Sequence, residues 1–424
     1  MLYNMDVNSV PSDIEKVAVK YRKSYIKFLT EMSGRELKVT EKKAANEAYK
    51  LFLYNCLICA VSCNNFAMSL DKNIYSKSPI RNGVLLKKKC SYTYTRRVVL
   101  FFESIGKISI DKGEVIEWKK VSEKFIPKDT KPTLITPKHS FKDELTDLEV
   151  SLESFKQINC LILRDSKKND IKFSRGGFQK EKIKMLEDYN IRALRTEITK
   201  VSGDKYLLQL RKIYNEDFQT GGRLYDLAVQ SMPKKERLKL LIDESPVSLL
   251  DYKAFETSLA YTLCDCKMKG DPYTIEFEEY HPDIVRKVCK LIMTRIYNCE
   301  DRTTLSYLVN KNIHDNFKLD KLVDEGKIPE KRIPVGMFID LLIQKHDAIE
   351  EYFFCGGENN LQYVGSQVMD YVIERVMQNH DKLVIPVFDE VVCPVDMTAS
   401  VLTYMEDAYT NILGSSENCK IEEE

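Results

Sequence analysis

The chain has 424 residues, of which 43% are hydrophobic and 30% are charged, and its formal net charge is +1. This length predicts two or three domains, and the composition is that of an ordinary globular protein rather than of a disordered or fibrous one. The longest strongly apolar run, residues 51–63, is shorter than the roughly 20 residues that a bilayer span needs. We therefore expect no membrane partner.

The N-terminus and the cysteines indicate the compartment. No basic-then-apolar secretory pattern opens the sequence, so we expect a cytoplasmic protein. In a reducing cytosol the 12 cysteines are expected to be buried thiols. Cys56, Cys59 and Cys63 share one face of a helix expected over 41–64, but no His or second Cys pair follows at zinc-ligand spacing, so core thiols are the better interpretation.

A second helix is expected over 12–32, and a basic stretch follows the two helices. Residues 51–100 contain eight Lys or Arg and one acid. A patch of this kind is typical of phosphate binding, and the alternative is a solvated face without a ligand. The candidate DNA-binding residues in it are Lys87, Lys88, Lys89, Arg96 and Arg97.

A further helix and a hairpin are expected next. Residues 91–104 predict a helix that ends at Gly106, and residues 107–110 and 114–118 predict strands joined by a turn at 111–113. This order is that of a winged helix, in which one helix enters the major groove of DNA. A small helical domain with an unrelated hairpin is the alternative.

These patterns divide the chain into a helical DNA-binding region over 1–125, a linker over 126–145 with three prolines, and a catalytic domain over 146–424. Asp147-Leu148-Glu149 has the form of a first exonuclease motif, but too few residues separate it from Arg223 for an exonuclease domain. We interpret it as a carboxylate pair at a helix start and expect no proofreading. The acidic C-terminus is expected to fray.

Two aspartates follow apolar strands in the expected catalytic domain. Residues 247–250 lead into Asp251, and residues 383–387 lead to Asp389 and Glu390. Such runs suit central strands of a covered sheet, and an acid after each would bring two carboxylates to one edge. Two carboxylates can hold two Mg²⁺ or Mn²⁺ ions, which activate a hydroxyl and offset charge on a leaving pyrophosphate. The alternative is two unrelated surface acids.

A basic helix lies between these aspartates in the sequence. Residues 282–298 predict a helix on which Arg286 and Lys290, four residues apart, project from one face. Tyr297, two turns on, falls near the same side. The two cations would suit the triphosphate of a nucleotide, although such a pair by itself also occurs on ordinary exposed helices.

These segments resemble the palm and fingers of family A DNA polymerases, whose superfamily includes the single-subunit phage and mitochondrial RNA polymerases. The resemblance covers residues 217–393, less than half of the chain, and its motifs occur in the family's order. A helix expected over 362–377 also fits the family's layout. The motifs are Thr220-Gly221-Gly222-Arg223-Leu224, Asp251-Tyr252-Lys253-Ala254-Phe255-Glu256, Arg286 with Lys290 and Tyr297, and Phe388-Asp389-Glu390.

The resemblance implies an α+β fold, with a right-hand palm, helical fingers and a reduced thumb behind the winged-helix-like domain. It also implies a role for each motif residue. Asp251 and Asp389 would bind the metal ions together with the backbone oxygen of Tyr252, and Glu390 would be a further catalytic residue. Glu256 would select deoxyribose, and Arg223 would contact the primer-template. The nucleotide would be bound by Arg286, Lys290 and Tyr297.

The function implied is template-directed addition of deoxynucleotides to a 3′-hydroxyl by a compact enzyme of phage or mobile-element type, acting in a bacterial or phage-infected cell. Its partners would be DNA primer-template, nucleoside triphosphates and replication proteins. A primase or RNA polymerase on the same palm, or a non-catalytic DNA-binding replication protein, are the alternatives. The sequence departs from the family where Phe388 replaces a histidine, Asn298 a glycine and Thr294 an aromatic residue.

Overall fold

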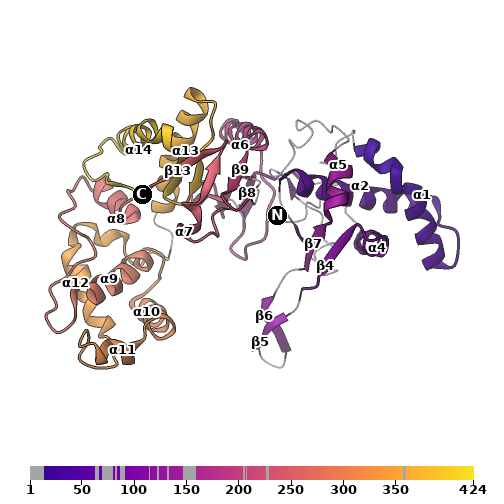
Figure 1. Ribbon diagram of the computed structural model, residues 1–424. Coiled ribbons are helices and arrows are strands. Elements are labelled where there is room, and N and C mark those ends of the chain that lie inside the picture. Colours follow the sequence, from indigo (N-terminus) through magenta and orange to yellow (C-terminus); the bar gives the residue numbers. More distant parts are fainter. Residues whose placement is uncertain are drawn as a thin grey trace. The chain divides into compact units, whose positions relative to one another are not determined.

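The computed structural model describes residues 14–62, 66–68, 80–81, 84–85, 91–113, 115–121, 124–130, 133–146, 159–203, 206, 208–225, 229–356 and 360–424. It is an α+β structure, as expected, with many helices and several small sheets (Figure 1). Two compact units share the chain, and each is assembled from segments that are separate in sequence. Unit 1 comprises Met1–Ile213, Leu224–Val247 and His380–Val387, and unit 2 comprises Tyr214–Arg223, Ser248–Asn379 and Phe388–Glu424.

The N-terminal part of unit 1 is a helical cluster with an aromatic core. Its helices are α1 (Ile14–Ser33), α2 (Val39–Ser62), α4 (Tyr92–Ser104) and α5 (His139–Thr146), and the first three match the expected helices. Tyr25 and Tyr49 stack with ring centroids 5.2 Å apart, and Phe52 stacks on Phe102 at 5.3 Å. Burial of such rings supplies much of the stabilisation of a small core.

The cysteines of α2 belong to this core. Cys56 and Cys59 are fully buried, which confirms the expectation of core thiols for these two. Cys63 lies outside the described residues.

A carboxylate at the edge of the cluster is enclosed by hydrogen-bond donors. Glu144 on α5 accepts hydrogen bonds from Lys20 Nζ (2.9 Å), from the Tyr21 hydroxyl (2.5 Å) and from Lys107 Nζ (2.5 Å). Burial by itself would raise the pKa of Glu144, but the three hydrogen bonds outweigh burial and lower it to about 2. The network ties α1 and α5 to the residue that precedes β4 (Ile108–Asp111).

The strands after α4 do not form the expected hairpin. The remaining strands in this region are β1 (Phe66–Met68), β2 (Ile80–Arg81), β3 (Val84–Leu85), β5 (Val115–Val121), β6 (Lys124–Thr130) and β7 (Thr133–Pro137). β4 pairs with β7, which also pairs with β1, whereas β5 pairs with β6 and β2 with β3. The expected pairing across 111–113 is therefore wrong, because a more distant strand takes the edge of β4.

The expected linker over 126–145 is also wrong. Its residues form most of β6, all of β7 and most of α5, and β7 alternates buried with half-buried residues, as a strand on a core does. The prolines suggested a linker, but Pro137 is the last residue of β7, where a missing backbone N–H costs little.

The rest of unit 1 is a small layer of helices and strands. Its elements are β8 (Leu161–Arg164), α6 (Gly177–Arg195), β9 (Ile198–Lys200), α7 (Lys234–Arg237), β12 (Leu240–Ile242) and β14 (Ile385–Val387). β12 pairs with β9 and with the first residues of β13 (Ser245–Tyr252). The Tyr189 hydroxyl of α6 donates to the backbone oxygen of Val384 at 2.6 Å, which fixes this helix within the layer.

Unit 2 contains the second part of β13, from Ser248 onward, together with further strands and helices. Its elements are the neighbouring ends of β10 (Arg211–Asn215) and β11 (Gly221–Tyr225), then β15 (Glu390–Pro394), β16 (Ile421–Glu423), η4 (Val395–Met397), α8 (Phe255–Leu263), α13 (Leu361–Asn379) and α14 (Thr398–Leu413). β13 is a neighbour of β15 and pairs antiparallel with β16, with Asp251 opposite Glu422. The C-terminus, expected to fray, is therefore a strand of this sheet.

A helical group completes unit 2. It consists of α9 (Pro282–Ile296), α10 (Arg302–Asn316), α11 (Leu319–Asp324), α12 (Val335–Lys345) and η3 (Asp347–Tyr352), drawn together in orange in Figure 1. The segment between α8 and α9, residues 264–281, contains no helix or strand.

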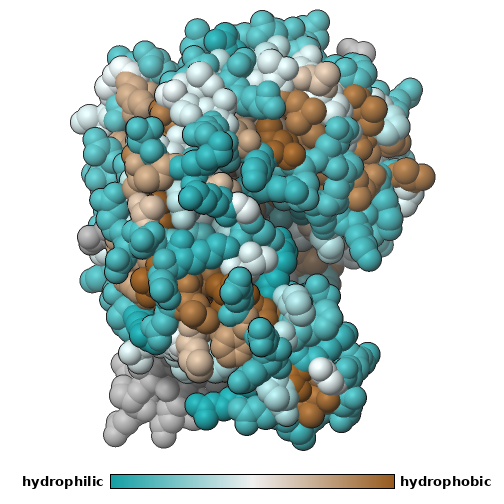
Figure 2. Space-filling model, turned by 90° about the vertical axis from the view of Figure 1, so that its left-hand side faces the viewer, coloured by the Kyte–Doolittle hydropathy of each residue, from teal (hydrophilic) through white to brown (hydrophobic). Residues whose placement is uncertain are grey.

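Within the described residues, no helix combines the length and the apolar character needed to cross a bilayer. On the face drawn in Figure 2, hydrophobic residues form separate patches among hydrophilic ones. Scattered exposed apolar residues of this kind are normal for globular proteins.

Candidate active site

Asp251 and Asp389 lie on neighbouring backbone segments of unit 2. Asp251 is the penultimate residue of β13, and Asp389 lies directly before β15, the neighbour of β13. The backbone N–H of Tyr252 donates to the backbone oxygen of Asp389 at 3.2 Å. Both aspartates are half-buried. The structure thus places the two aspartates, expected on separate strands, on neighbouring backbone segments.

The backbone is strained beside each aspartate. Ala254, three residues after Asp251, has φ +49°, and Phe388, directly before Asp389, has φ +60°. Residues with side chains seldom occupy this left-handed region, and such outliers concentrate at functional sites because surrounding structure must enforce them. Phe388 is 45% exposed.

At two carboxyl groups of this site, burial outweighs the nearby cations. Burial raises the pKa of Asp389, Glu390 raises it further, and Arg223 and Lys290 lower it without reversing the shift. Burial likewise raises the pKa of Glu256, although Arg223 Nη2 lies 2.6 Å from its Oε1, and Asp389 adds to that increase. A cation bound at these side chains would relieve the cost of burying their charges.

The donor set suits Mg²⁺ or Mn²⁺ rather than a closed structural metal centre. In the part of the chain that the structure describes, no three His, Cys, Asp or Glu side chains form a ready-made metal site. Mg²⁺ usually binds through one or two carboxylates, several waters and the phosphates of a substrate, so adjacent Asp251 and Asp389 are a sufficient protein contribution.

Two other residues expected at the metal site have different environments. The Tyr252 side chain is 2% exposed and donates its hydroxyl to the backbone oxygen of Met405 at 2.7 Å, so only its backbone oxygen remains a possible ligand. Glu390, the first residue of β15, is 4% exposed and lies further inside than Asp389.

Helix α9 presents the expected cations. Pro282 at its first turn and the His281 side chain, which accepts from the Asp283 backbone N–H, favour a helix start there. One face is buried, and Arg286 and Lys290 lie on the exposed face. Since Lys290 lowers the pKa of Asp389, Lys290 lies within electrostatic reach of that carboxylate.

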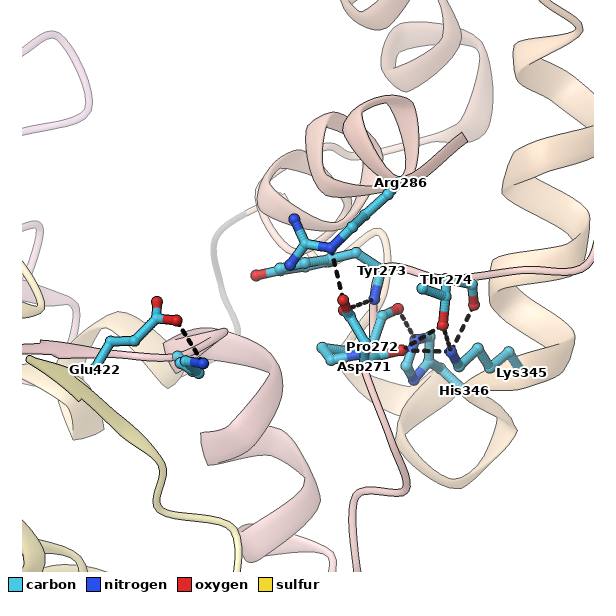
Figure 3. Close-up of polar contacts among 9 residues, drawn as sticks. Asp271, Pro272, Tyr273, Thr274, Arg286, Lys345, His346 and Glu422 are labelled. Atoms are coloured by element: carbon cyan, nitrogen blue, oxygen red, sulfur yellow. Dashed lines mark hydrogen bonds and ion pairs between the residues drawn. The ribbon is translucent and has the colours of Figure 1, made fainter. Parts of the chain in front are cut away.

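Tyr273 is a residue of this site that the sequence did not indicate. It lies in the segment without helix or strand before α9, and its ring centroid is 5.6 Å from the Arg286 guanidinium and 5.9 Å from Lys290 Nζ. Figure 3 shows the Arg286 guanidinium extended over the Tyr273 ring. Only chain folding brings this tyrosine to the helix, because no motif or periodicity links residue 273 to α9.

Tyr297, which was expected to contact the nucleotide, is buried in this structure. The Tyr297 side chain is 1% exposed, packs against Phe353 and donates its hydroxyl to Thr257 Oγ1 at 2.9 Å. It lies just after the last residue of α9 and faces the core because its position falls on the buried side of that helix. Tyr297 therefore joins the end of α9 to α8.

Arg223 lies beside the carboxylates in unit 2. It pairs with Glu256 and is 6.0 Å from the Phe388 ring centroid. The preceding residue must be glycine: Gly222 has φ +77°, and a Cβ there would lie 2.7 Å from Tyr214 and 2.8 Å from Ser366. The second glycine of this motif thus permits close backbone packing.

In unit 1, the expected DNA-binding residues are only partly described. Arg96 on α4 is exposed, and Arg97 lies 5.6 Å from the centroid of the Tyr94 ring. Lys87, Lys88 and Lys89 lie outside the described residues.

Comparison with known proteins gives little further guidance. No family model matches the sequence, and no curated protein matches it. Among solved structures, the chain is similar to the POL domain of Pol1 from M. smegmatis, in complex with DNA primer-template and dNTP, at a TM-score of 0.31 and 10% sequence identity. The match covers 99% of this chain and 66% of that one. The function is therefore inferred from the residues of the site.

Proposed function

We propose that this protein is a nucleotidyltransferase of DNA polymerase type, which adds deoxynucleotides to the 3′-hydroxyl of a primer paired with a DNA template. The observation that carries this proposal is the adjacent placement of Asp251 and Asp389 on neighbouring backbone segments, with Lys290 of α9 within electrostatic reach of Asp389. Phosphoryl transfer needs little covalent chemistry from a protein, and positioning and charge stabilisation do most of the catalytic work.

Each group has a role in this proposal. Asp251 and Asp389 would hold two Mg²⁺ or Mn²⁺ ions, with the Tyr252 backbone oxygen as a further ligand. When bound, such ions lower the pKa of an attacking hydroxyl and offset the charge of a leaving pyrophosphate. Arg286 and Lys290 would bind the triphosphate, because a guanidinium fork and an ammonium both recognise phosphate oxygens.

Glu256 would restrict the sugar. Its carboxylate lies beside Arg223 and close enough to Asp389 to be affected by its charge. A ribose 2′-hydroxyl placed there would meet the Glu256–Arg223 pair, which favours a deoxynucleotide. Arg223 would contact the primer-template near the primer end once its pairing with Glu256 loosens.

The finer architecture is part of the same proposal. The sheet of β13, β15 and β16 would form the palm, and the helical group α9–α12 the fingers. Arg96 and Arg97 on α4, with Lys87–Lys89, would add a winged-helix-like DNA contact in unit 1. We also propose that the described catalytic unit has no proofreading exonuclease activity.

Primer extension by the full chain tests this function. A labelled primer-template is incubated with dNTPs or NTPs and with Mg²⁺ or Mn²⁺, and we expect extension with dNTPs that Asp251→Asn abolishes. Asp340→Asn is the matched control, since Asp340 is an exposed acid of unit 2 paired with Arg302. Extension with NTPs alone would indicate a primase or RNA polymerase. If the chain binds DNA but extends the primer with neither dNTPs nor NTPs, the remaining interpretation is a non-catalytic DNA-binding replication protein.

A further inference from the structure

The ring of Tyr273 lies next to both cations of α9. Its centroid is 5.6 Å from the Arg286 guanidinium and 5.9 Å from Lys290 Nζ, and both distances are within the range of cation–π attraction. Arg286 and Lys290 are one helical turn apart, so a single ring can contact both the guanidinium and the ammonium group. Without a fixed neighbour, these long side chains would sample many rotamers.

Tyr273 is itself held firmly, although its segment has no regular secondary structure. Its side chain is 8% exposed. Its backbone N–H donates to Asp271 Oδ1 at 2.9 Å, and Lys345 Nζ donates to the backbone oxygens of Asp271 and Thr274, both at 2.6 Å. Figure 3 shows the two contacts of Lys345 with this segment.

A buried histidine directly after α12 fixes the same segment. His346 is 1% exposed, and its Nε2 lies 2.9 Å from the backbone oxygen of Pro272 while its Nδ1 lies 3.0 Å from the Tyr261 hydroxyl. Burial lowers the pKa of His346 and favours the neutral ring. A carbonyl oxygen only accepts, so Nε2 donates to Pro272 and Nδ1 accepts from Tyr261.

Asp271 sets the direction of Arg286. Asp271 Oδ2 accepts from Arg286 Nε at 2.6 Å. This contact uses the inner nitrogen of the guanidinium, and the terminal nitrogens extend across the Tyr273 ring (Figure 3). A guanidinium held in this way presents its outer donors in a fixed plane, which suits a phosphate group.

Tyr273 also lies within electrostatic reach of carboxylates of the site. Burial raises the pKa of the Tyr273 hydroxyl, and the charges of Asp389, Asp271 and Glu256 raise it further.

We propose that Tyr273 is a positioning residue that holds Arg286 and Lys290 in the geometry required by the triphosphate of an incoming nucleotide. Tyr273 can have this role only if α9 binds phosphate, as the function proposed above requires.

Binding of inorganic tripolyphosphate to the full chain, measured by calorimetry, tests this role. Tyr273→Leu removes the ring without changing charge, and we expect binding to weaken roughly 5- to 30-fold. Tyr273→Phe keeps the ring and is expected to stay within about twofold of the original. Tyr273→Met is the second variant if the leucine variant does not fold. In primer extension, the leucine variant should raise KM for dNTP and leave kcat nearly unchanged.

Tyr280→Leu is the control for general loss of packing. Tyr280 lies in the same segment, is 5% exposed and packs against Phe277 and Phe338, away from the two cations. It should lower stability without changing tripolyphosphate affinity. Equal weakening by Tyr280→Leu and Tyr273→Leu, or unchanged affinity in Tyr273→Leu, would overturn the positioning role.

Arg286→Gln separates this inference from the proposed function. If Arg286→Gln weakens tripolyphosphate binding and Tyr273→Leu does not, only the role of Tyr273 fails. If Arg286→Gln has no effect either, α9 is not a phosphate site, and the proposed function loses its nucleotide contact.

Discussion

Glu144 in unit 1 and Asp389 in unit 2 are both half-buried carboxylates, yet their surroundings shift their pKa values in opposite directions. Three donors outweigh burial at Glu144 and lower its pKa to about 2, whereas burial prevails at Asp389 and raises its pKa. Glu144 is therefore already compensated by the protein, as a structural ion pair is. At Asp389 and at Glu256, which is paired with Arg223, burial outweighs the nearby cations, and a bound cation would offset the remaining cost.

The sharpest way to break this comparison is Asp389→Asn. We expect primer extension to fall by at least about a thousandfold, because metal binding supplies several kcal/mol of transition-state stabilisation. The free energy of unfolding should stay equal or rise slightly, since a poorly compensated buried charge is removed. Thermal melting with and without Mg²⁺ gives an independent readout: Mg²⁺ should raise the melting temperature of the original chain and not that of the variant. Loss of activity together with a large loss of stability would contradict the comparison.

Neutralising the cations of α9 should have the next largest effect. For Arg286→Gln or Lys290→Gln, we expect KM for dNTP to rise about ten- to a hundredfold, the range for a lost hydrogen bond to a charged group. Steady-state primer extension measures it. Arg302→Gln is the matched control, because Arg302 is equally exposed in the same unit and pairs with Asp340. A similar KM increase in the control would show that the effect comes from the reduced positive charge of the unit and not from a specific contact of α9 with the nucleotide.

Glu144→Gln should show the opposite pattern to Asp389→Asn. Activity per folded molecule should remain, and the free energy of unfolding should fall by about 1–3 kcal/mol, because Lys20, Tyr21 and Lys107 lose a charged acceptor. Chemical denaturation followed by circular dichroism measures this change. Asp143→Asn, which removes an exposed acid of the same helix, 3.3 Å from His139 Nδ1, should cost less.

The pH dependence of stability should carry the smallest effect. The lowered pKa of Glu144 stabilises the fold above its ordinary value of 4.5, and this contribution is lost as pH falls toward about 2. The raised pKa values of Asp389 and Glu256 act the other way, because their contribution is present below their ordinary values and is lost as pH rises. Urea denaturation over a pH series should show a weaker acid loss in Glu144→Gln. An unchanged acid profile would contradict the assignment.

The sequence by itself determined the elements with strong periodicity or caps. The helices over 12–32, 41–64, 91–104, 282–298 and 362–377 match α1, α2, α4, α9 and α13 within a few residues, because an amphipathic repeat is local information. The sequence also indicated the two aspartates and the α9 cations as candidates, since a strand-then-acid pattern and an i,i+4 spacing are visible in one chain segment.

The tertiary structure alone decided which strands pair and which side chains meet. β4 pairs with β7 instead of β5, and residues 421–423 pair with β13, because strand pairing depends on contacts between segments far apart in the chain. Tyr297 lies in the core, while Tyr273, which no motif indicated, lies beside the α9 cations. Local sequence reports which face of a helix is apolar, but only folding determines which distant residue covers the other face.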